Sequence, residues 1–284
     1  MSLSTAFEHH TAQVGDVTIH YVRMGNGAPL VLLHGWPQTW FAWRHMIPLL
    51  AQHYTVIAPD LRGLGDSSKP VNDYDKRTIA EDVYQLTLQL GFEHILLVGH
   101  DWGGHIAYAY AAGHRDGVQR LAIVESLVRS GDTVRDAALG NDAWFATFHR
   151  IPNLPETLIS GRERVYLSWF YENLPAVKGA ITEADIDEYV RTYSDPGALR
   201  AGFELYRALP TDLKNNAMSA QNPLRIPVFA LGGDKSLGPK TRQALEVLAT
   251  DVRGGIIKNC GHFVPEEYPD LLASQLLEFF AEEQ

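Results

Sequence analysis

The chain of 284 residues has a single cysteine, Cys260, so no internal disulfide can form and a reducing, cytoplasmic location is expected. Basic residues are in deficit, since 24 Lys and Arg stand against 34 Asp and Glu. The resulting net charge of −10 disfavours nucleic acids and anionic membranes as partners. No apolar run approaches membrane-spanning length. The N-terminus has no basic segment followed by an apolar core, so we expect no signal peptide.

What remains is the composition of an ordinary globular protein, with 45% hydrophobic and 20% charged residues. The length suits one large domain with an insertion, or two small domains. A homodimer is compatible with the sequence. No cluster with metal-ligand spacing and no phosphate-binding loop is visible, so no cofactor is expected; Gly63-Leu64-Gly65 has Ser68 where a dinucleotide motif needs a third glycine.

Short apolar runs alternate with segments of helical periodicity, which predicts an α/β fold with a mostly parallel sheet. The predicted strands are Val17–Arg23, Leu30–Leu33, Tyr54–Ala58, Ile95–Val98, Leu121–Val124, Ile226–Leu231 and Gly255–Lys258. The predicted flanking helices are Lys76–Leu90, Gly104–Ala112 and Leu271–Ala281. His9 and His10 are interpreted as part of a solvated terminus.

The alternation fails between about residues 127 and 223, which contain clustered aromatics and no convincing strand. Prolines divide this segment into short helices, predicted at Glu163–Leu174, Glu183–Tyr193 behind a Thr182 cap, and Leu199–Leu209. We therefore expect a core domain of residues 1–126 and 224–284, with residues 127–223 as a helical cap inserted after the sixth strand. Such a cap would lie over the strand ends, where ligands bind in open α/β sheets.

The most informative stretch is the apolar run Ile95–Val98 followed by Gly99-His100-Asp101-Trp102-Gly103. Gly99 and Gly103 flank Asp101 at the spacing of a nucleophile elbow, a tight strand-to-helix turn that exposes the central side chain. Most such turns carry serine, and no Gly-x-Ser-x-Gly occurs in this chain. A carboxylate that attacks a saturated carbon becomes an ester, which activated water can cleave. Asp101 thus indicates substitution at an sp³ carbon, as in epoxides or organohalides.

Four ordered motifs resemble those of α/β-hydrolases of the epoxide hydrolase group, which is related to haloacetate and haloalkane dehalogenases. They are His34-Gly35-Trp36-Pro37, Asp60-Leu61-Arg62-Gly63-Leu64-Gly65-Asp66-Ser67, Gly99-His100-Asp101-Trp102-Gly103-Gly104 and Gly261-His262-Phe263-Val264-Pro265-Glu266. The resemblance runs from about Gly15 to Ala281 and implies an α/β-hydrolase fold. It also implies nucleophile, acid and base in that chain order, with an oxyanion hole formed by the backbone N–H groups of Trp36 and Trp102.

His262 follows the last predicted strand and has the pKa class of a general base near neutrality. Two carboxylates are candidates for the acid that orients it. Asp234 lies near the usual family position but out of register with it. Glu125 ends the sixth strand, where some related enzymes keep this acid. A glutamate at the end of an apolar run is costly to bury unless its carboxylate has a partner. We favour Glu125.

The resemblance assigns Tyr206 as the proton donor to the opening epoxide. For a second donor, Trp144 stands at the place of the usual histidine and His149 lies one turn later, so both remain candidates. His34 is assigned with them to the substrate-binding side.

The predicted function is hydrolysis of a small-molecule epoxide to a vicinal diol through an aspartyl ester. The alternative is dehalogenation of a haloacid or haloalkane by the same machinery, with Trp102 and Trp144 cradling the halide. Against it, Trp102 and His105 occupy the places where haloacetate dehalogenases carry arginines. A non-enzymatic receptor with this fold is less favoured, because no member of the triad is missing.

Overall fold

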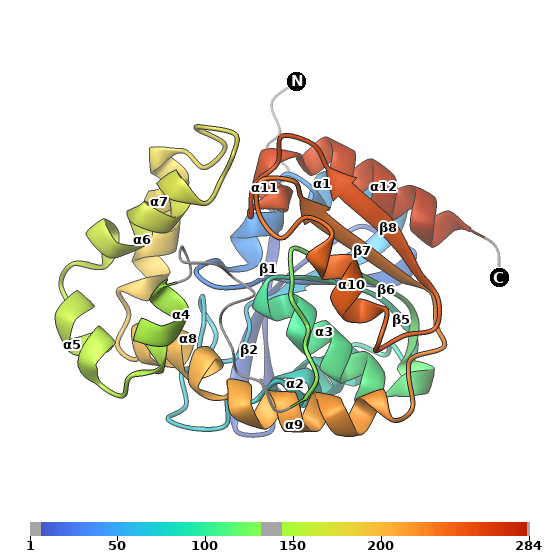
Figure 1. Cartoon of the computed structure of the whole chain (residues 1–284), viewed down its shortest axis with the longest axis horizontal. Helices are drawn as coiled ribbons and strands as arrows, with labels where there is room; N and C mark the ends of the chain where they lie inside the picture. The colour runs from blue at the N-terminus through green and yellow to red at the C-terminus, as the bar shows by residue number, and fades with distance from the viewer. Residues whose placement is uncertain (1–6, 132–143, 283–284) are drawn as a thin grey trace.

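A computed structural model describes residues 7–131 and 144–282. At its centre is an eight-stranded sheet in the order β1-β2-β4-β3-β5-β6-β7-β8 (Figure 1). β2 pairs antiparallel with β1 and β4, and all other pairs are parallel. The strands are β1 (Glu8–Val14), β2 (Val17–Met24), β3 (Ala28–Leu33), β4 (Tyr54–Pro59), β5 (Ile95–His100), β6 (Val118–Val124), β7 (Val228–Gly233) and β8 (Val252–Ile257).

Helices cover both faces of this sheet, which confirms the predicted α/β class. Those of the core are α1 (Ile47–Leu50), α2 (Lys76–Gln89), α3 (Trp102–Gly113), α10 (Lys240–Leu245), α11 (Val264–Glu267) and α12 (Pro269–Ala281), with short 3-10 helices η1 (Trp40–Trp43) and η2 (Arg115–Gly117). Between β6 and β7 lie α4 (Trp144–Arg150), α5 (Leu154–Ile159), α6 (Glu163–Asn173), α7 (Glu183–Tyr193), α8 (Ala198–Arg207) and α9 (Leu209–Ala220), called the inserted helices below.

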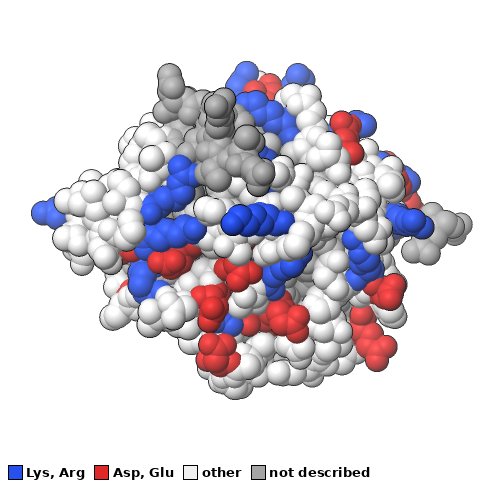
Figure 2. Space-filling view, turned by 60° about the horizontal axis from the view of Figure 1, so that its bottom comes forward, with Lys and Arg blue, Asp and Glu red and all other residues white. Residues whose placement is uncertain are grey.

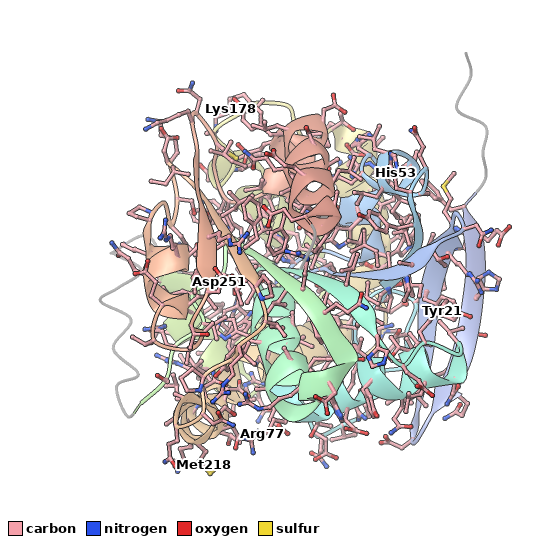
Figure 3. All side chains as sticks on the ribbon, turned by 90° about the vertical axis from the view of Figure 1, so that its right-hand side faces the viewer. Tyr21, His53, Arg77, Lys178, Met218 and Asp251 are labelled. Carbon is pink, nitrogen blue, oxygen red and sulfur yellow. The ribbon has the colours of Figure 1, made fainter. Side chains whose placement is uncertain are left out.

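The apolar runs are unbroken because their strands are buried on both faces. Successive side chains of a strand point to opposite faces. Val31 and Leu33 of β3 accordingly pack into the cluster that contains α2 and α3, whereas Leu30 and Leu32 pack into the cluster that contains α1 and α12. The sheet is thus the middle layer of three. Figure 3 shows it from the side, with Tyr21 of β2 near one edge and Asp251, just before β8, toward the other.

In Figure 1, α4 to α8 lie to the left of the sheet, whereas α9 runs along the bottom of the picture. No strand occurs among the described residues between 127 and 223. The ends of the inserted helices follow local sequence rules. Thr182 caps α7 in a capping box with Asp185, and Pro155 and Pro210 lie in the first turns of α5 and α9. Part of the predicted insertion, residues 132–143, lies outside the described residues.

Two elements differ from the expectation. The terminus expected at His9 and His10 is edge strand β1, in which His9 is exposed and His10 half-buried; the His9 and His20 ring nitrogens lie 3.0 Å apart. The helix predicted to end at Leu209 stops at Arg207, and α9 continues the chain.

On the face shown in Figure 2, basic side chains form a band with acidic ones beneath it, so the net charge does not give this face one sign.

The strand order places the chemistry. β3 lies between β4 and β5, so the chain leaves β3 and β5 in opposite directions, and the carboxyl ends of these neighbours form a switch point where α/β sheets bind ligands. Trp36 follows β3 and Asp101 follows β5, while Glu125 ends the adjacent β6. The sheet therefore brings three predicted site residues to one edge.

Candidate active site

The turn at Asp101 is as tight as the two glycines suggest. A Cβ on Gly99 would lie 2.2 Å from the Gly103 carbonyl oxygen, and a Cβ on Gly103 would lie 2.2 Å from that of Leu33. Asp101 itself has φ +52°, a conformation that L-residues other than Asn and Asp rarely adopt. α3 begins at the next residue, Trp102. The strained backbone lifts the Asp101 side chain off the sheet and into the space beneath the inserted helices.

The two oxygens of Asp101 have different surroundings. The backbone N–H of Trp36 donates to Oδ1 over 2.8 Å, and a backbone hydrogen bond from Trp102 also reaches the carboxylate. Oδ2 lies 3.6 Å from Nε2 of His262. Burial raises the pKa of Asp101, and the neighbouring His262 and these two N–H groups oppose that rise. Both predicted oxyanion-hole donors thus reach the Asp101 carboxylate: the Trp36 N–H holds Oδ1, and Oδ2 faces the imidazole.

On its other side His262 meets Glu125. Its Nδ1 lies 3.2 Å from Glu125 Oε2, whereas Oε1 accepts the backbone N–H groups of Gly233 and Leu237 at 2.6 and 3.2 Å. Burial disfavours the imidazolium, but the hydrogen bond with Glu125 and the charge of Asp101 outweigh it and raise the pKa of His262. Asp234 instead accepts the backbone N–H of Cys260 at 3.3 Å. The structure therefore joins Asp101, His262 and Glu125, and leaves Asp234 outside.

The loop that carries His262 is held by polar groups that the sequence analysis did not single out. The carboxylate of Glu267 accepts the backbone N–H groups of Gly261 and Phe263 at 2.9 and 3.1 Å. His100 Nε2 donates to the His262 carbonyl at 2.8 Å, and burial lowers the pKa of His100 to about 3, which keeps this imidazole neutral. His100 lies within the third motif and Glu267 directly after the fourth, but the sequence does not show that these polar side chains are buried.

Tyr206, on α8, faces Asp101 from the inserted helices. Its ring packs edge-on against Trp102 and Trp36, with centroid separations of 4.9 and 5.7 Å. Burial and the charge of Asp101 raise the pKa of Tyr206 well above its usual value, and a hydrogen bond from the Trp102 side chain opposes this rise. The phenol is therefore protonated at neutral pH and has an indole N–H that can stabilise the phenolate.

The other three residues assigned to the substrate side do not line the cavity. Trp144 is 45% exposed at the start of α4. His149 is buried behind Tyr206, with its Nε2 2.5 Å from the hydroxyl of Tyr166 and its ring stacked on Phe203. His34 is buried below the oxyanion turn, where its Nε2 accepts the backbone N–H of Leu61 at 3.1 Å. The paired cradle of Trp102 and Trp144 is not formed.

A cavity of about 510 Å³ lies between these groups and the inserted helices. Asp101, His262, Tyr206 and both predicted oxyanion-hole residues line it, with an apolar wall that includes Phe145, Trp169, Phe170 and Leu209. Arg129 and Arg150 also line it, as do His105, Lys235 and Lys240. These two arginines come from segments on either side of residues 132–143, away from the positions of Trp102 and His105 where haloacetate dehalogenases carry arginines.

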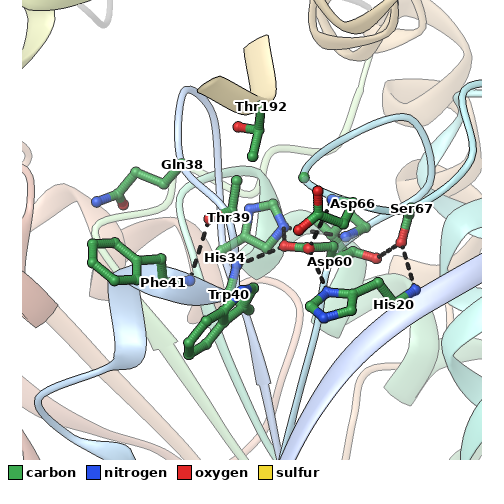
Figure 4. A network of polar contacts seen from close by, with 12 residues as sticks. His20, His34, Gln38, Thr39, Trp40, Phe41, Asp60, Asp66, Ser67 and Thr192 are labelled. Carbon is green, nitrogen blue, oxygen red and sulfur yellow. Dashed lines mark hydrogen bonds and ion pairs between the residues drawn. The ribbon is translucent and has the colours of Figure 1, made fainter. Parts of the chain in front are cut away.

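The second motif supports the oxyanion turn from behind (Figure 4). Asp60 accepts the backbone N–H groups of Trp40 and Asp66 at 2.8 and 3.0 Å, and His20 Nδ1 at 2.7 Å. A Cβ on Gly65 would lie 2.1 Å from the carboxylate carbon of Asp60, which explains that glycine. His20, Asp60 and Asp66 form the one group with metal-ligand spacing among the described residues. Because these Asp60 oxygens already accept protein hydrogen bonds, the group fits a structural role.

The chain was compared with known proteins. The alpha/beta hydrolase fold model matches residues 28–269. A soluble epoxide hydrolase of Corynebacterium sp. (strain C12) is 43% identical, over 98% of this chain and 99% of the relative. A fluoroacetate dehalogenase of Burkholderia sp. is 34% identical, over 97% and 94%. The solved structure of epoxide hydrolase CorEH without ligand matches with TM-score 0.91 and 44% identity, over 97% and 99%. In residues 7–131 and 144–282, no helix is long and apolar enough to cross a membrane.

Proposed function

This chain belongs to the α/β-hydrolase fold family, and on that premise we propose that it is an epoxide hydrolase that forms vicinal diols through an ester on Asp101. The observation that carries the proposal is the orientation of the Asp101 carboxylate. Oδ1 accepts the Trp36 N–H, while Oδ2 lies 3.6 Å from Nε2 of His262, on the side open to the cavity. A carboxylate held in this way is a nucleophile for a saturated carbon.

In the first step Oδ2 attacks an epoxide carbon, the carbon–oxygen bond of the ring breaks, and the ring oxygen takes the proton of Tyr206. Because the pKa of Tyr206 lies well above its usual value, the phenol carries its proton until an alkoxide forms beside it. The hydrogen bond from Trp102 then stabilises the phenolate. The first step therefore needs Asp101 and Tyr206 but no base.

In the second step His262 takes a proton from water, which attacks the ester carbonyl carbon. That carbonyl oxygen is Oδ1, which already accepts the Trp36 N–H, and the Trp102 N–H reaches the same carboxylate, so both donors can stabilise the oxyanion that develops. Glu125 stabilises the imidazolium through Nδ1. The bond between Oδ2 and the Asp101 carboxyl carbon then breaks, so Oδ2 leaves in the diol and takes the proton held by His262. The water oxygen stays on Asp101, and the new carboxylic acid returns its proton to the Tyr206 phenolate.

We further propose that residues 127–223 act as a cap domain on a core of residues 1–126 and 224–284. The inserted helices supply Tyr206 and the apolar wall of the cavity, while the core supplies Asp101, Glu125 and His262. A cap of this kind excludes water from the first step and sets which epoxides fit.

A haloacid dehalogenase is the second candidate, supported by Arg129 and Arg150 in the cavity wall and by the fluoroacetate dehalogenase relative. An arginine pair suits a substrate carboxylate. The exposed position of Trp144 argues against it, because this indole does not reach a departing halide.

The deciding experiment compares diol formation from styrene oxide with halide release from fluoroacetate and chloroacetate, using one enzyme preparation. We expect kcat/KM for styrene oxide to exceed that for both haloacids, and Asp101→Asn to abolish diol formation. Rapid halide release with no diol from styrene oxide or epichlorohydrin would contradict the proposal and establish the dehalogenase instead.

A further inference from the structure

Lys76, the first residue of α2, is a buried cation at the junction of the core and the inserted helices. Its side chain is 3% exposed, and its Nζ lies 2.9 Å from Oδ2 of Asp212 on α9. The backbone N–H of Lys76 donates to the other oxygen of Asp212 at 2.8 Å. Burying an ion pair costs desolvation of both charges, and an apolar pair of the same volume is often as stable. The energetics of folding alone give no clear reason to keep this pair.

The remaining partners of Lys76 lead to the proposed proton donor. Its Nζ donates to the carbonyl of Leu205, the residue that precedes Tyr206 on α8. The same Nζ lies 4.1 Å from the centroid of the Trp102 ring, and the Trp102 side chain hydrogen-bonds to Tyr206. Lys76 therefore contacts both the backbone that places Tyr206 and the indole that donates to its hydroxyl.

A cation over an indole ring withdraws electron density from it, which makes the ring N–H a stronger donor. A stronger donor stabilises the phenolate that remains when Tyr206 gives its proton to the alkoxide. Among the groups that oppose the burial-driven rise in the pKa of Asp101, Lys76 contributes least, after His262 and the N–H groups of Trp102 and Trp36, so ionisation of the nucleophile does not depend on it. The effect of Lys76 therefore falls on ring opening, in which the phenolate forms, and not on the attack of water on the ester.

We propose that Lys76 is a positioning residue for ring opening. Paired with Asp212, it fixes Tyr206 against the core and strengthens the Trp102–Tyr206 hydrogen bond. It therefore accelerates formation of the Asp101 ester and not its hydrolysis. This inference rests on the proposed epoxide hydrolase function. Arg77 of α2 extends this junction between α2 and α9 on the outside, where it donates to the Asn215 carbonyl of α9 at 3.1 Å. Figure 3 shows Arg77 beside Met218, which also lies on α9.

The test measures the two steps separately by single-turnover kinetics with styrene oxide. In the variant Lys76→Met/Asp212→Asn both charges are removed together, so no unpaired charge remains buried. We expect ester formation to slow about tenfold, between the effects of exposed and desolvated cation–π contacts, with ester hydrolysis unchanged. In a Tyr206→Phe background the same double change should slow ester formation less than about twofold, because its effect passes through the phenol.

The matched control is Asp82→Asn on the same helix, which breaks the buried pair of Asp82 with Arg62 away from the cavity. It should leave both rates unchanged. If the double variant does not fold, Lys76→Gln, which keeps an N–H donor but loses the charge, must show the same pattern. Equal slowing of both steps, or an undiminished effect in the Tyr206→Phe background, would overturn the inference. Wild-type protein that forms neither ester nor diol would overturn the proposed function itself.

Discussion

Removing the hydroxyl of Tyr206 separates proton donation from every other feature of the cavity. Phenylalanine keeps the ring contacts with Trp36, Trp102 and His149, whose centroids lie 5.7, 4.9 and 4.5 Å away. Loss of a general acid costs about 10²- to 10⁴-fold. The Trp102 N–H loses its acceptor and becomes able to hydrogen-bond to the alkoxide, which places the expected loss near the lower end. We predict that Tyr206→Phe slows ester formation by about 10²-fold, or about 2.7 kcal/mol of transition-state stabilisation.

The assay is single-turnover formation of the Asp101 ester with styrene oxide, followed by rapid quench and intact-mass measurement. The free energy of unfolding should fall by only about 1–2 kcal/mol, since a single buried donor is left without its acceptor. Any halide release from chloroacetate serves as the internal control, because a halide needs no proton. Ester formation within threefold of wild type would refute the role given to Tyr206, and an equal loss on both substrates would indicate a collapsed cavity.

Three further outcomes test the rest of the machinery. Glu125→Gln should slow ester hydrolysis far more than Asp234→Asn, since Glu125 alone of the two reaches His262; the reverse order in single-turnover hydrolysis would restore Asp234 as the relay acid. His262→Gln should still form the ester, and intact-mass spectrometry should then show one added substrate mass that persists. Because His262 must be neutral to accept a proton, ester hydrolysis should fall about tenfold per pH unit below the pKa of His262. Esterification removes the Asp101 charge that helps to raise this pKa, so the midpoint of ester hydrolysis should lie below the pKa of His262 in the free enzyme. Glu125→Gln removes a group that raises this pKa, so it should move the midpoint to lower pH; a midpoint that stays in place would contradict the assignment.

The sequence predicted those parts of the fold whose residues are buried on both sides. The apolar runs of β3 to β7 are visible because each of these strands lies between two helical layers. Edge strand β8 is mostly half-buried or exposed, and its predicted range matched only its second half. The strand β1 was not predicted, because it pairs on one side only and its residues from Glu8 to Gln13 are exposed or half-buried on both faces. An edge strand with polar side chains on both faces has no apolar alternation to detect.

The members of the candidate site that end strands could be predicted, because the carboxyl ends of parallel strands meet at one edge. Glu125 and Asp101 follow neighbouring strands, so the spacing along the chain translates directly into proximity. Residues on the inserted helices lack such a frame. Trp144 and His149 are five positions apart on one helix, which turns about 100° per residue, so their side chains point about 140° apart. The position of Trp144 at the place of the usual histidine therefore does not decide which of the two side chains faces inward.

The cations of the cavity wall could not be predicted for a related reason. Arg129 and Arg150 lie on either side of residues 132–143, and Lys235 and Lys240 follow a different strand. Their convergence depends on how the inserted helices lie over the sheet, and no local pattern encodes that arrangement. Glu267 and His100 were missed because their roles are to hold the His262 loop, which becomes visible only once hydrogen-bond partners are known.

The central claim is that Asp101 forms a covalent ester whose carbonyl carbon is attacked by water. A single turnover with excess enzyme in H₂¹⁸O, followed by mass spectrometry of the Asp101 peptide and of the diol, tests it most directly. Water attacks the carboxyl carbon, so the label should enter Asp101, and the diol of the first turnover should carry none. Label in that first diol, with an unlabelled Asp101 peptide, would show that water attacks the epoxide directly and would contradict the account.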